Sequence, residues 1–91
     1  MTTAEIVALA DRYLCPTYAR APLAIVRGEG SRVWDADGRA YLDFFSSTVV
    51  TNLGHQHPAI VAAITAQAHK ILHVSNLHYS EPQARLAERL V

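Results

Sequence analysis

The sequence predicts mixed α and β structure: one helix, then a three-stranded antiparallel meander, then two more helices. Two observations predict this order. Residues 23–45 hold short runs of β-favouring residues separated by glycine, and the segments on either side place apolar residues at helical spacing. The 91 residues are 51% hydrophobic and 18% charged, which is typical of a globular chain and not of a disordered one.

The first helix is predicted within residues 1–15. Thr2 and Glu5 have the spacing of a capping box at its start. Apolar residues follow at spacings of three and four and fall on one stripe: Ile6, Leu9, Ala10 and Tyr13. We expect Tyr13 to pack along this stripe and the helix to stop before Pro16, because proline cannot continue it. Residues 17–22 then form a connector.

The meander is predicted over residues 23–45, with strands at Leu23–Arg27, Arg32–Asp35 and Ala40–Phe44. The gaps hold glycine and aspartate, which suit chain reversals because they accept positive φ or bond nearby backbone groups. The aspartates there are therefore expected to organise turns and not to act as a paired general acid and base. Gly28 and Gly30 lack the third glycine and the following helix of a phosphate-binding loop, so they indicate a turn.

Residues 46–54 have polar groups around an apolar centre and are predicted to form a loop with an extended piece, the best candidate for lining an active site. Pro58 suits the first position of a helix that runs to about residue 72. Its apolar residues are expected on one face: Ile60, Val61, Ile64, Ala68, Ile71 and Leu72. Another helix is predicted over residues 81–91, opened by a capping box at 80–83. No C-cap follows it, so we expect the chain to be incomplete.

The charge pattern limits the possible partners. Eight basic and eight acidic residues are dispersed along the chain, which predicts neither a nucleic-acid-binding surface nor an anionic-membrane patch. The first residues lack a basic export signal, and no apolar run approaches the ~18 residues of a membrane span. Cys15 is the single cysteine, which fits a reducing compartment. A cytoplasmic location is therefore expected.

An ordered series of short strings carries a family resemblance. The strings are RGEG at 27–30, VWDADG at 33–38, YLDF at 41–44, NLGHQHP at 52–58, HVSN at 73–76 and EPQARLA at 81–87. In this order they resemble the N-terminal part of the class III pyridoxal-phosphate-dependent aminotransferases. The likeness is strongest to the acetylornithine aminotransferases and spans about residues 17–90.

The resemblance implies the large α/β fold of fold-type I aminotransferases, to which this chain would contribute an N-terminal segment. It implies a longer parent enzyme that moves an amino group between N-acetylornithine and 2-oxoglutarate in arginine biosynthesis, with pyridoxal 5'-phosphate as cofactor. It also implies a homodimer around a shared active site, with residues His73–Tyr79 near the dimer contact.

Two residues are implied to bind the substrate. Tyr18 corresponds to an aromatic residue of the connector that approaches substrate in related enzymes, and a phenol offers a flat surface and a hydroxyl. Thr48 falls where different subfamilies place different residues. Many acetylornithine enzymes have a glycine near Ser47, so this sequence departs from the pattern there.

No catalytic, cofactor-binding or metal-binding residue is expected within the chain. Its only lysine, Lys70, stands outside any match to the family's Schiff-base lysine motif. The phosphate loop, the carboxylate for the ring nitrogen and the substrate-binding arginine are implied to lie beyond Val91. The chain by itself is therefore expected to be inactive.

Three alternatives remain open at this point. Within the family, the amino donor could be ornithine, succinylornithine, 4-aminobutyrate or a diaminopimelate precursor. Outside it, the chain could be a noncatalytic α+β interaction module whose apolar helix faces bind another protein. A metal-binding domain is the third alternative, because the chain has five histidines. His55 and His57 are two residues apart and His69 and His73 are four apart, although no HExxH pattern occurs. The absence of a GxSxG elbow disfavours hydrolytic catalysis.

Overall fold

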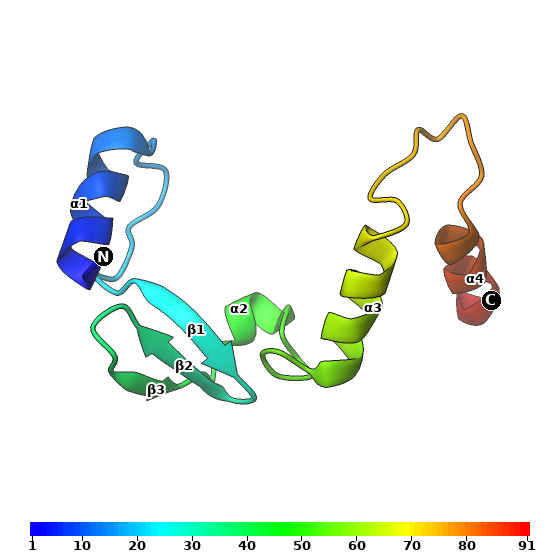
Figure 1. Cartoon of the computed structure of the whole chain (residues 1–91). Helices are drawn as coiled ribbons and strands as arrows, with labels where there is room; N and C mark the ends of the chain where they lie inside the picture. Colours follow the sequence, from blue (N-terminus) through cyan, green and yellow to red (C-terminus); the bar gives the residue numbers. More distant parts are fainter. The chain divides into compact units, whose positions relative to one another are not determined.

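The computed structural model describes all residues 1–91, which form two compact units, Met1–Pro58 and Ala59–Val91. The elements run in the order α1 (Thr3–Tyr13), β1 (Ile25–Glu29), β2 (Arg32–Asp35), β3 (Ala40–Leu42), α2 (Ser46–Val49), α3 (Pro58–Ala68) and α4 (Glu81–Leu90) (Figure 1). The predicted succession of a helix, a three-stranded antiparallel sheet and further helices is confirmed. None of the helices combines the length and the apolar character that crossing a bilayer requires.

The capping box of α1 is confirmed. Glu5 donates its backbone N–H to Thr2 Oγ1 at 3.2 Å, and the Glu5 carboxylate accepts the Thr2 N–H at 2.8 Å. The N–H of Thr3 donates to Asp37 Oδ1 at 3.1 Å, which ties the first turn of α1 to the turn between β2 and β3. The prediction for Tyr13 was wrong: its ring is exposed beneath the Arg12 guanidinium, because no element of this chain covers that side of the helix.

The sheet has the order β1-β2-β3, and both pairs are antiparallel. β1 ends two residues later than predicted, because Gly28 and Glu29 pair with Val33 and Arg32 and the hairpin reverses just after them. β3 ends at Leu42 and not at Phe44, because the carboxylate of Asp43 accepts the backbone N–H groups of Phe45 and Ser46 and so turns the chain out of the strand. The meander is therefore shorter and tighter than the sequence suggested.

Asp35 organises the turn between β2 and β3, as expected for a turn aspartate. It is only 3% exposed. Its Oδ1 accepts the N–H groups of Asp37 and Arg39 at 3.0 and 2.8 Å, and its Oδ2 accepts the Tyr41 hydroxyl at 2.7 Å. The hydrogen bond from Tyr41, followed by those backbone donors, lowers the pKa of Asp35 below its ordinary value, and the same bond raises the pKa of Tyr41.

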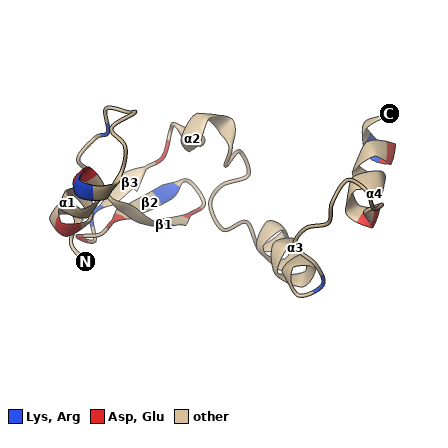
Figure 2. Cartoon of the chain, turned by 90° about the horizontal axis from the view of Figure 1, so that it is seen from above, with Lys and Arg blue, Asp and Glu red and all other residues tan.

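The unit Ala59–Val91 departs from prediction at both of its helices. α3 ends at Ala68, before the expected residue 72. Its own apolar side chains are distributed around the whole helix instead of forming one face, and it carries no charged residue (Figure 2). Such a helix is suited to burial on every side. At α4 the predicted capping box is absent: the Ser80 side chain makes no capping bond, and Pro82 removes one of the two N–H groups that it could have bonded.

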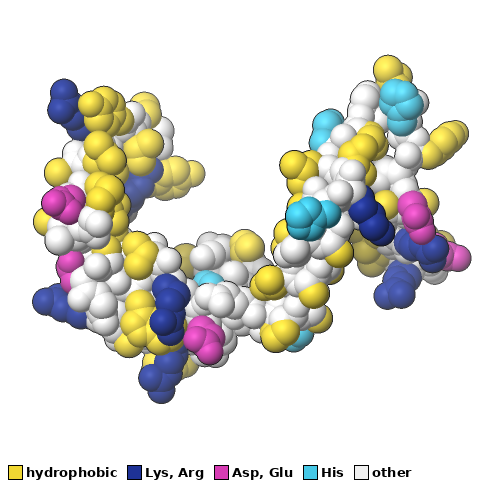
Figure 3. All heavy atoms as spheres, viewed as in Figure 1, with side chains coloured by type: hydrophobic (Ala, Val, Ile, Leu, Met, Phe, Trp, Pro, Cys, Tyr) yellow, Lys and Arg dark blue, Asp and Glu magenta, His cyan; other side chains and the backbone are white.

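Very little of the chain is buried. Ala24 is the one buried apolar residue, and Ala59–Val91 contains no buried residue at all. Apolar side chains cover much of the visible surface of both units (Figure 3). The chain exposes 8263 Å², whereas a folded monomer of its mass ordinarily exposes about 5,200 Å². These faces have the character of surfaces that pack against further protein.

Candidate functional site

The loop that follows β3 contains an unusual backbone turn. Four consecutive residues have positive φ: 49° at Ser46, 48° at Ser47, 61° at Thr48 and 66° at Val49. α2 is therefore a single left-handed turn, and not the loop with an extended piece that the sequence suggested. Left-handed geometry costs about 1–2 kcal/mol for each residue that carries a Cβ, and it is rarest for β-branched residues such as Thr48 and Val49. Strain of this kind is concentrated at functional sites.

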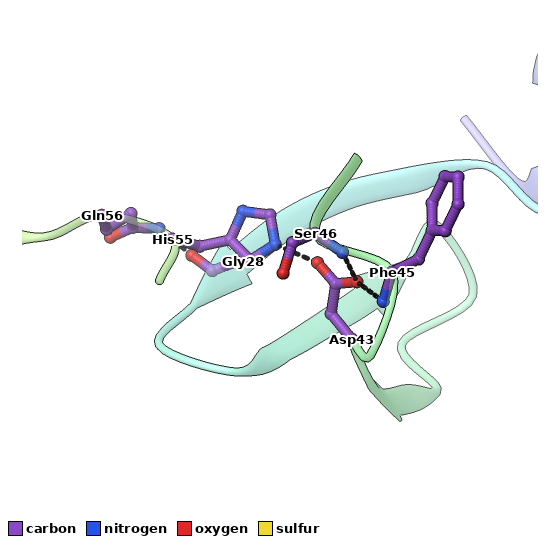
Figure 4. A network of polar contacts seen from close by, with 6 residues as sticks. All are labelled: Gly28, Asp43, Phe45, Ser46, His55 and Gln56. Carbon is purple, nitrogen blue, oxygen red and sulfur yellow. Dashed lines mark hydrogen bonds and ion pairs between the residues drawn. The ribbon is translucent and has the colours of Figure 1, made fainter. Parts of the chain in front are cut away.

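Asp43 holds the start of this turn. Its Oδ1 accepts the backbone N–H of Phe45 at 3.0 Å and that of Ser46 at 2.8 Å (Figure 4). Within the turn, the N–H of Val50 donates to the carbonyl of Ser46 at 2.8 Å. The carboxylate thus fixes the direction in which the chain enters α2.

His55 holds the other end of the loop. Its Nε2 lies 2.7 Å from Asp43 Oδ2, and the two side chains are only 22% and 14% exposed. The bond to His55, followed by the N–H of Ser46, lowers the pKa of Asp43 below its ordinary value. The carboxylate is therefore ionised at neutral pH and can only accept, so Nε2 carries the proton and donates it. We call this pair the Asp43–His55 clamp.

The clamp is attached to the sheet through the backbone of His55. Its N–H donates to the carbonyl of Gly30 at 2.9 Å, and its carbonyl accepts the N–H of Gly30 at 3.0 Å. Gln56 Nε2 donates to the carbonyl of Gly28 at 2.6 Å. A Cβ at Gly28 would lie 2.5 Å from His55 Cγ, so the imidazole occupies space that only glycine leaves open. The base of the loop is therefore rigidly joined to the hairpin of β1 and β2.

The two predicted substrate-binding residues lie in the unit Met1–Pro58. Tyr18 is 75% exposed and stands in the connector after α1, where the Arg20 guanidinium lies 5.8 Å from its ring centroid. It lines an open groove of about 450 Å³ between α1 and the connector. Thr48 is exposed on α2, and its N–H donates to the carbonyl of Phe45 at 3.1 Å. No hydrogen bond or ring contact joins Tyr18 to Thr48.

The sequence reasoning missed the roles of Asp43 and His55. Both stand in the quoted strings, at YLDF and NLGHQHP, and an aspartate directly after a strand is itself a signal for turn formation. Nothing in the local pattern indicates that the two side chains meet, because twelve positions separate them.

The residues of this chain do not by themselves fit pyridoxal phosphate. A lysine that forms a Schiff base stands in a desolvated pocket, whereas Lys70 is exposed beside an open groove of about 480 Å³. The acidic residue of that groove, Glu81, is already bonded to Arg85 at 2.8 Å. The histidines, acidic residues and cysteine also form no group of three or more that could hold a metal ion.

Comparison with known proteins identifies the relatives of this chain. The sequence model of the class-III aminotransferases matches residues 13–91. A Pseudomonas aeruginosa protein named succinylornithine transaminase/acetylornithine aminotransferase is 57% identical over 81 residues, which cover 89% of this chain and 20% of that protein. The chain spans about a fifth of the length of the curated relatives that it matches.

Two solved structures share its arrangement of elements. The crystal structure of acetylornithine aminotransferase from Elizabethkingia anophelis superposes with a TM-score of 0.94 at 31% identity, over 99% of this chain and 24% of that one. Taurine:2-oxoglutarate aminotransferase from Bifidobacterium kashiwanohense was solved in complex with PLP and glutamate. It superposes with a TM-score of 0.86 at 34% identity, over 99% of this chain and 21% of that one. The backbone described above is thus that of a segment of much longer aminotransferases.

Proposed function

This chain belongs to the class-III aminotransferases, and we propose that it is the N-terminal segment of a longer enzyme that transfers an amino group from N-acetylornithine to 2-oxoglutarate. The observation that carries the proposal is the match over residues 13–91, joined by the 57% identity to the Pseudomonas aeruginosa relative. The extensive exposed apolar surface supports the longer chain, because those faces need further protein to cover them.

The amino donor has a second candidate. The name of the Pseudomonas aeruginosa relative joins succinylornithine and acetylornithine activities. Both donors are ornithine with one amine acylated, and they differ in the size and charge of the acyl group. N-acetylornithine remains the first choice, because it also appears in the name of the structural neighbour with a TM-score of 0.94.

Pyridoxal phosphate is the proposed cofactor of the complete enzyme, and 2-oxoglutarate the proposed acceptor. The neighbour from Bifidobacterium kashiwanohense was solved with PLP and glutamate, the aminated form of 2-oxoglutarate, which supports both. Because Lys70 and its surroundings do not fit the cofactor, its lysine, its phosphate donors and its ring carboxylate belong to the remainder of the enzyme.

The contribution of this chain is to bind and orient the amino donor. Tyr18 offers an exposed ring for contact and a hydroxyl for a hydrogen bond. Thr48 offers a hydroxyl and a methyl group from the left-handed turn α2. In this proposal both side chains contact the donor in the assembled site, and neither takes part in proton transfer.

The complete enzyme acts as a homodimer in the cytoplasm, within arginine biosynthesis. Exposed apolar residues in the segment His73–Tyr79 support a contact with a second subunit there, since Leu77 and Tyr79 are almost wholly exposed. An exposed, unpaired Cys15 fits a reducing compartment. The acylated ornithine donors favoured above are the basis for the biosynthetic assignment.

A substrate panel tests this function. The complete protein, purified with pyridoxal phosphate, would be given 2-oxoglutarate and N-acetylornithine, N-succinylornithine, ornithine or 4-aminobutyrate in turn, with glutamate formation as the readout. We expect the highest kcat/KM with N-acetylornithine. A clear preference for another donor would remove the subfamily assignment, and no turnover with any donor would favour the noncatalytic interaction module.

A further inference from the structure

The left-handed turn α2 is the most strained backbone in the chain, and it carries the Thr48 side chain. Each of its four residues has a Cβ and therefore favours other backbone regions when nothing holds it. Within this segment the apolar side chains around the turn do not hold it, because Phe45, Val49 and Val50 are all exposed. The contacts that hold α2 from inside this chain are the polar ones at the base of the loop.

The Asp43–His55 clamp supplies those contacts. One Asp43 oxygen accepts both N–H groups that lead into α2, and the other accepts the proton on His55 Nε2. His55 is immobilised in turn by its two backbone bonds to Gly30 and by the fit of its ring over Gly28. The loop is therefore closed at its base against a fixed part of the sheet, as in a compact Ω-loop.

We propose that Asp43 and His55 are positioning residues for the amino donor: the hydrogen bond between them keeps α2 left-handed and so presents Thr48 in one geometry. The inference rests on the proposed function, in which Thr48 contacts the donor. Neither residue of the clamp touches the donor. If the clamp is broken, the fraction of molecules with α2 in the held form falls, and the apparent affinity for the donor falls by the same fraction.

The variant His55→Phe tests the clamp in the complete holoenzyme. Phenylalanine keeps a ring over Gly28 but has no group that can donate to Asp43. We expect KM for the amino donor to rise about 5- to 30-fold, the factor that corresponds to the cost of one left-handed residue. Because saturating donor selects the held form, kcat should change by less than about twofold.

A second substitution separates positioning from general damage. Ser47 has positive φ, and glycine adopts such a backbone without the Cβ penalty. Adding Ser47→Gly to His55→Phe should therefore recover about fivefold in KM. His55→Gln, whose amide can still donate to Asp43, should lie closer to the native protein than His55→Phe. Glu29→Gln, which changes an exposed ion pair on β1, is the matched control and should leave KM unchanged.

Hydrogen exchange gives a readout that does not depend on activity. The amides of Phe45 and Ser46 should exchange slowly in the native protein and faster in His55→Phe, because Asp43 is then free to turn away from them. If His55→Phe does not fold, Asp43→Ala removes both acceptor oxygens of the clamp, and the same two measurements apply.

The outcomes are distinct. A raised KM with little change in kcat, faster exchange, and recovery by Ser47→Gly support the proposal. Unchanged exchange in both clamp variants overturns it, as does faster exchange with KM unaltered, a fall in kcat at constant KM, or no recovery by Ser47→Gly. Absence of turnover in the native protein overturns the proposed function and with it the role toward the donor. Turnover with an intact KM in His55→Phe overturns the clamp alone.

Discussion

The imidazole of His55 lies directly over Gly28, so that a Cβ built on the glycine would stand 2.5 Å from His55 Cγ. This contact joins the strand β1 to the base of the loop that carries α2. It explains why the chain has glycine at a strand position, where glycine ordinarily weakens a strand.

The first prediction concerns this contact. Gly28→Ala should destabilise the complete protein by about 1–3 kcal/mol, because the ring of His55 must move and is held by Asp43 and by Gly30. Chemical denaturation would measure the change. Gly30→Ala is the comparison, since a Cβ there meets no atom within 4 Å and the variant suffers only from its φ of 54°. Equal stability of Gly28→Ala and the native protein would show that the ring is not fixed.

A second prediction concerns the strain in α2. Ser47→Gly should stabilise the complete protein by about 1 kcal/mol, because it removes the Cβ penalty at a φ of 48°. Thermal unfolding would register this as a higher Tm. Ser31→Gly, at a turn residue without positive φ, is the matched control and should lower stability slightly through the greater freedom of the unfolded chain. A lower Tm for Ser47→Gly would indicate that the serine makes contacts worth more than the strain.

The third prediction is a pH dependence. Asp35 and Asp43 both have a lowered pKa in the folded chain, from an ordinary value of 3.8. Their contribution to stability is therefore complete above the ordinary pKa and is lost as the pH falls through the lowered, folded value. Stability measured by denaturation from pH 6 down to about pH 2 should decline in the acid range.

Variants assign that decline to individual residues. The largest cause of the lowered pKa is the Tyr41 hydroxyl for Asp35 and the His55 side chain for Asp43. Tyr41→Phe should make the Asp35 part of the decline smaller, because the folded pKa of Asp35 then lies closer to its ordinary value. Asp43→Asn should remove the Asp43 part. The same acid profile in both variants as in the native protein would contradict the assignment.

A fourth prediction addresses the chain by itself. Expressed alone, residues 1–91 should associate or aggregate, because their 8263 Å² of exposed surface includes most of their large apolar side chains. Sedimentation velocity would report the size of the species. A compact monomer that unfolds cooperatively would contradict the view that these faces require additional protein.

The fifth prediction tests the proposed contact of Tyr18. Tyr18→Phe in the complete enzyme should raise KM for the amino donor about two- to tenfold, the range for one neutral hydrogen bond. Tyr13→Phe is the matched control, since that tyrosine is also exposed but lies on α1 beneath Arg12. Identical kinetics of both variants would mean that the Tyr18 hydroxyl does not contact the donor.

The sequence by itself determined the features that depend on near neighbours. The capping box of Thr2 and Glu5 and the turn bonds of Asp35 join residues two to four positions apart, so residue type and spacing were sufficient to predict them. The order of the elements follows from the same short-range patterns, and the series of strings was sufficient to identify the family.

Only the tertiary structure decided how the loop is held. The left-handed form of α2 opposes the local preference of four residues that carry a Cβ, and propensity could not have predicted it. The bond from His55 to Asp43 and the fit of its ring over Gly28 join positions 12 and 27 residues apart. Contacts of that range depend on which segments the folded sheet brings together, and side-chain chemistry along the chain does not specify them in advance.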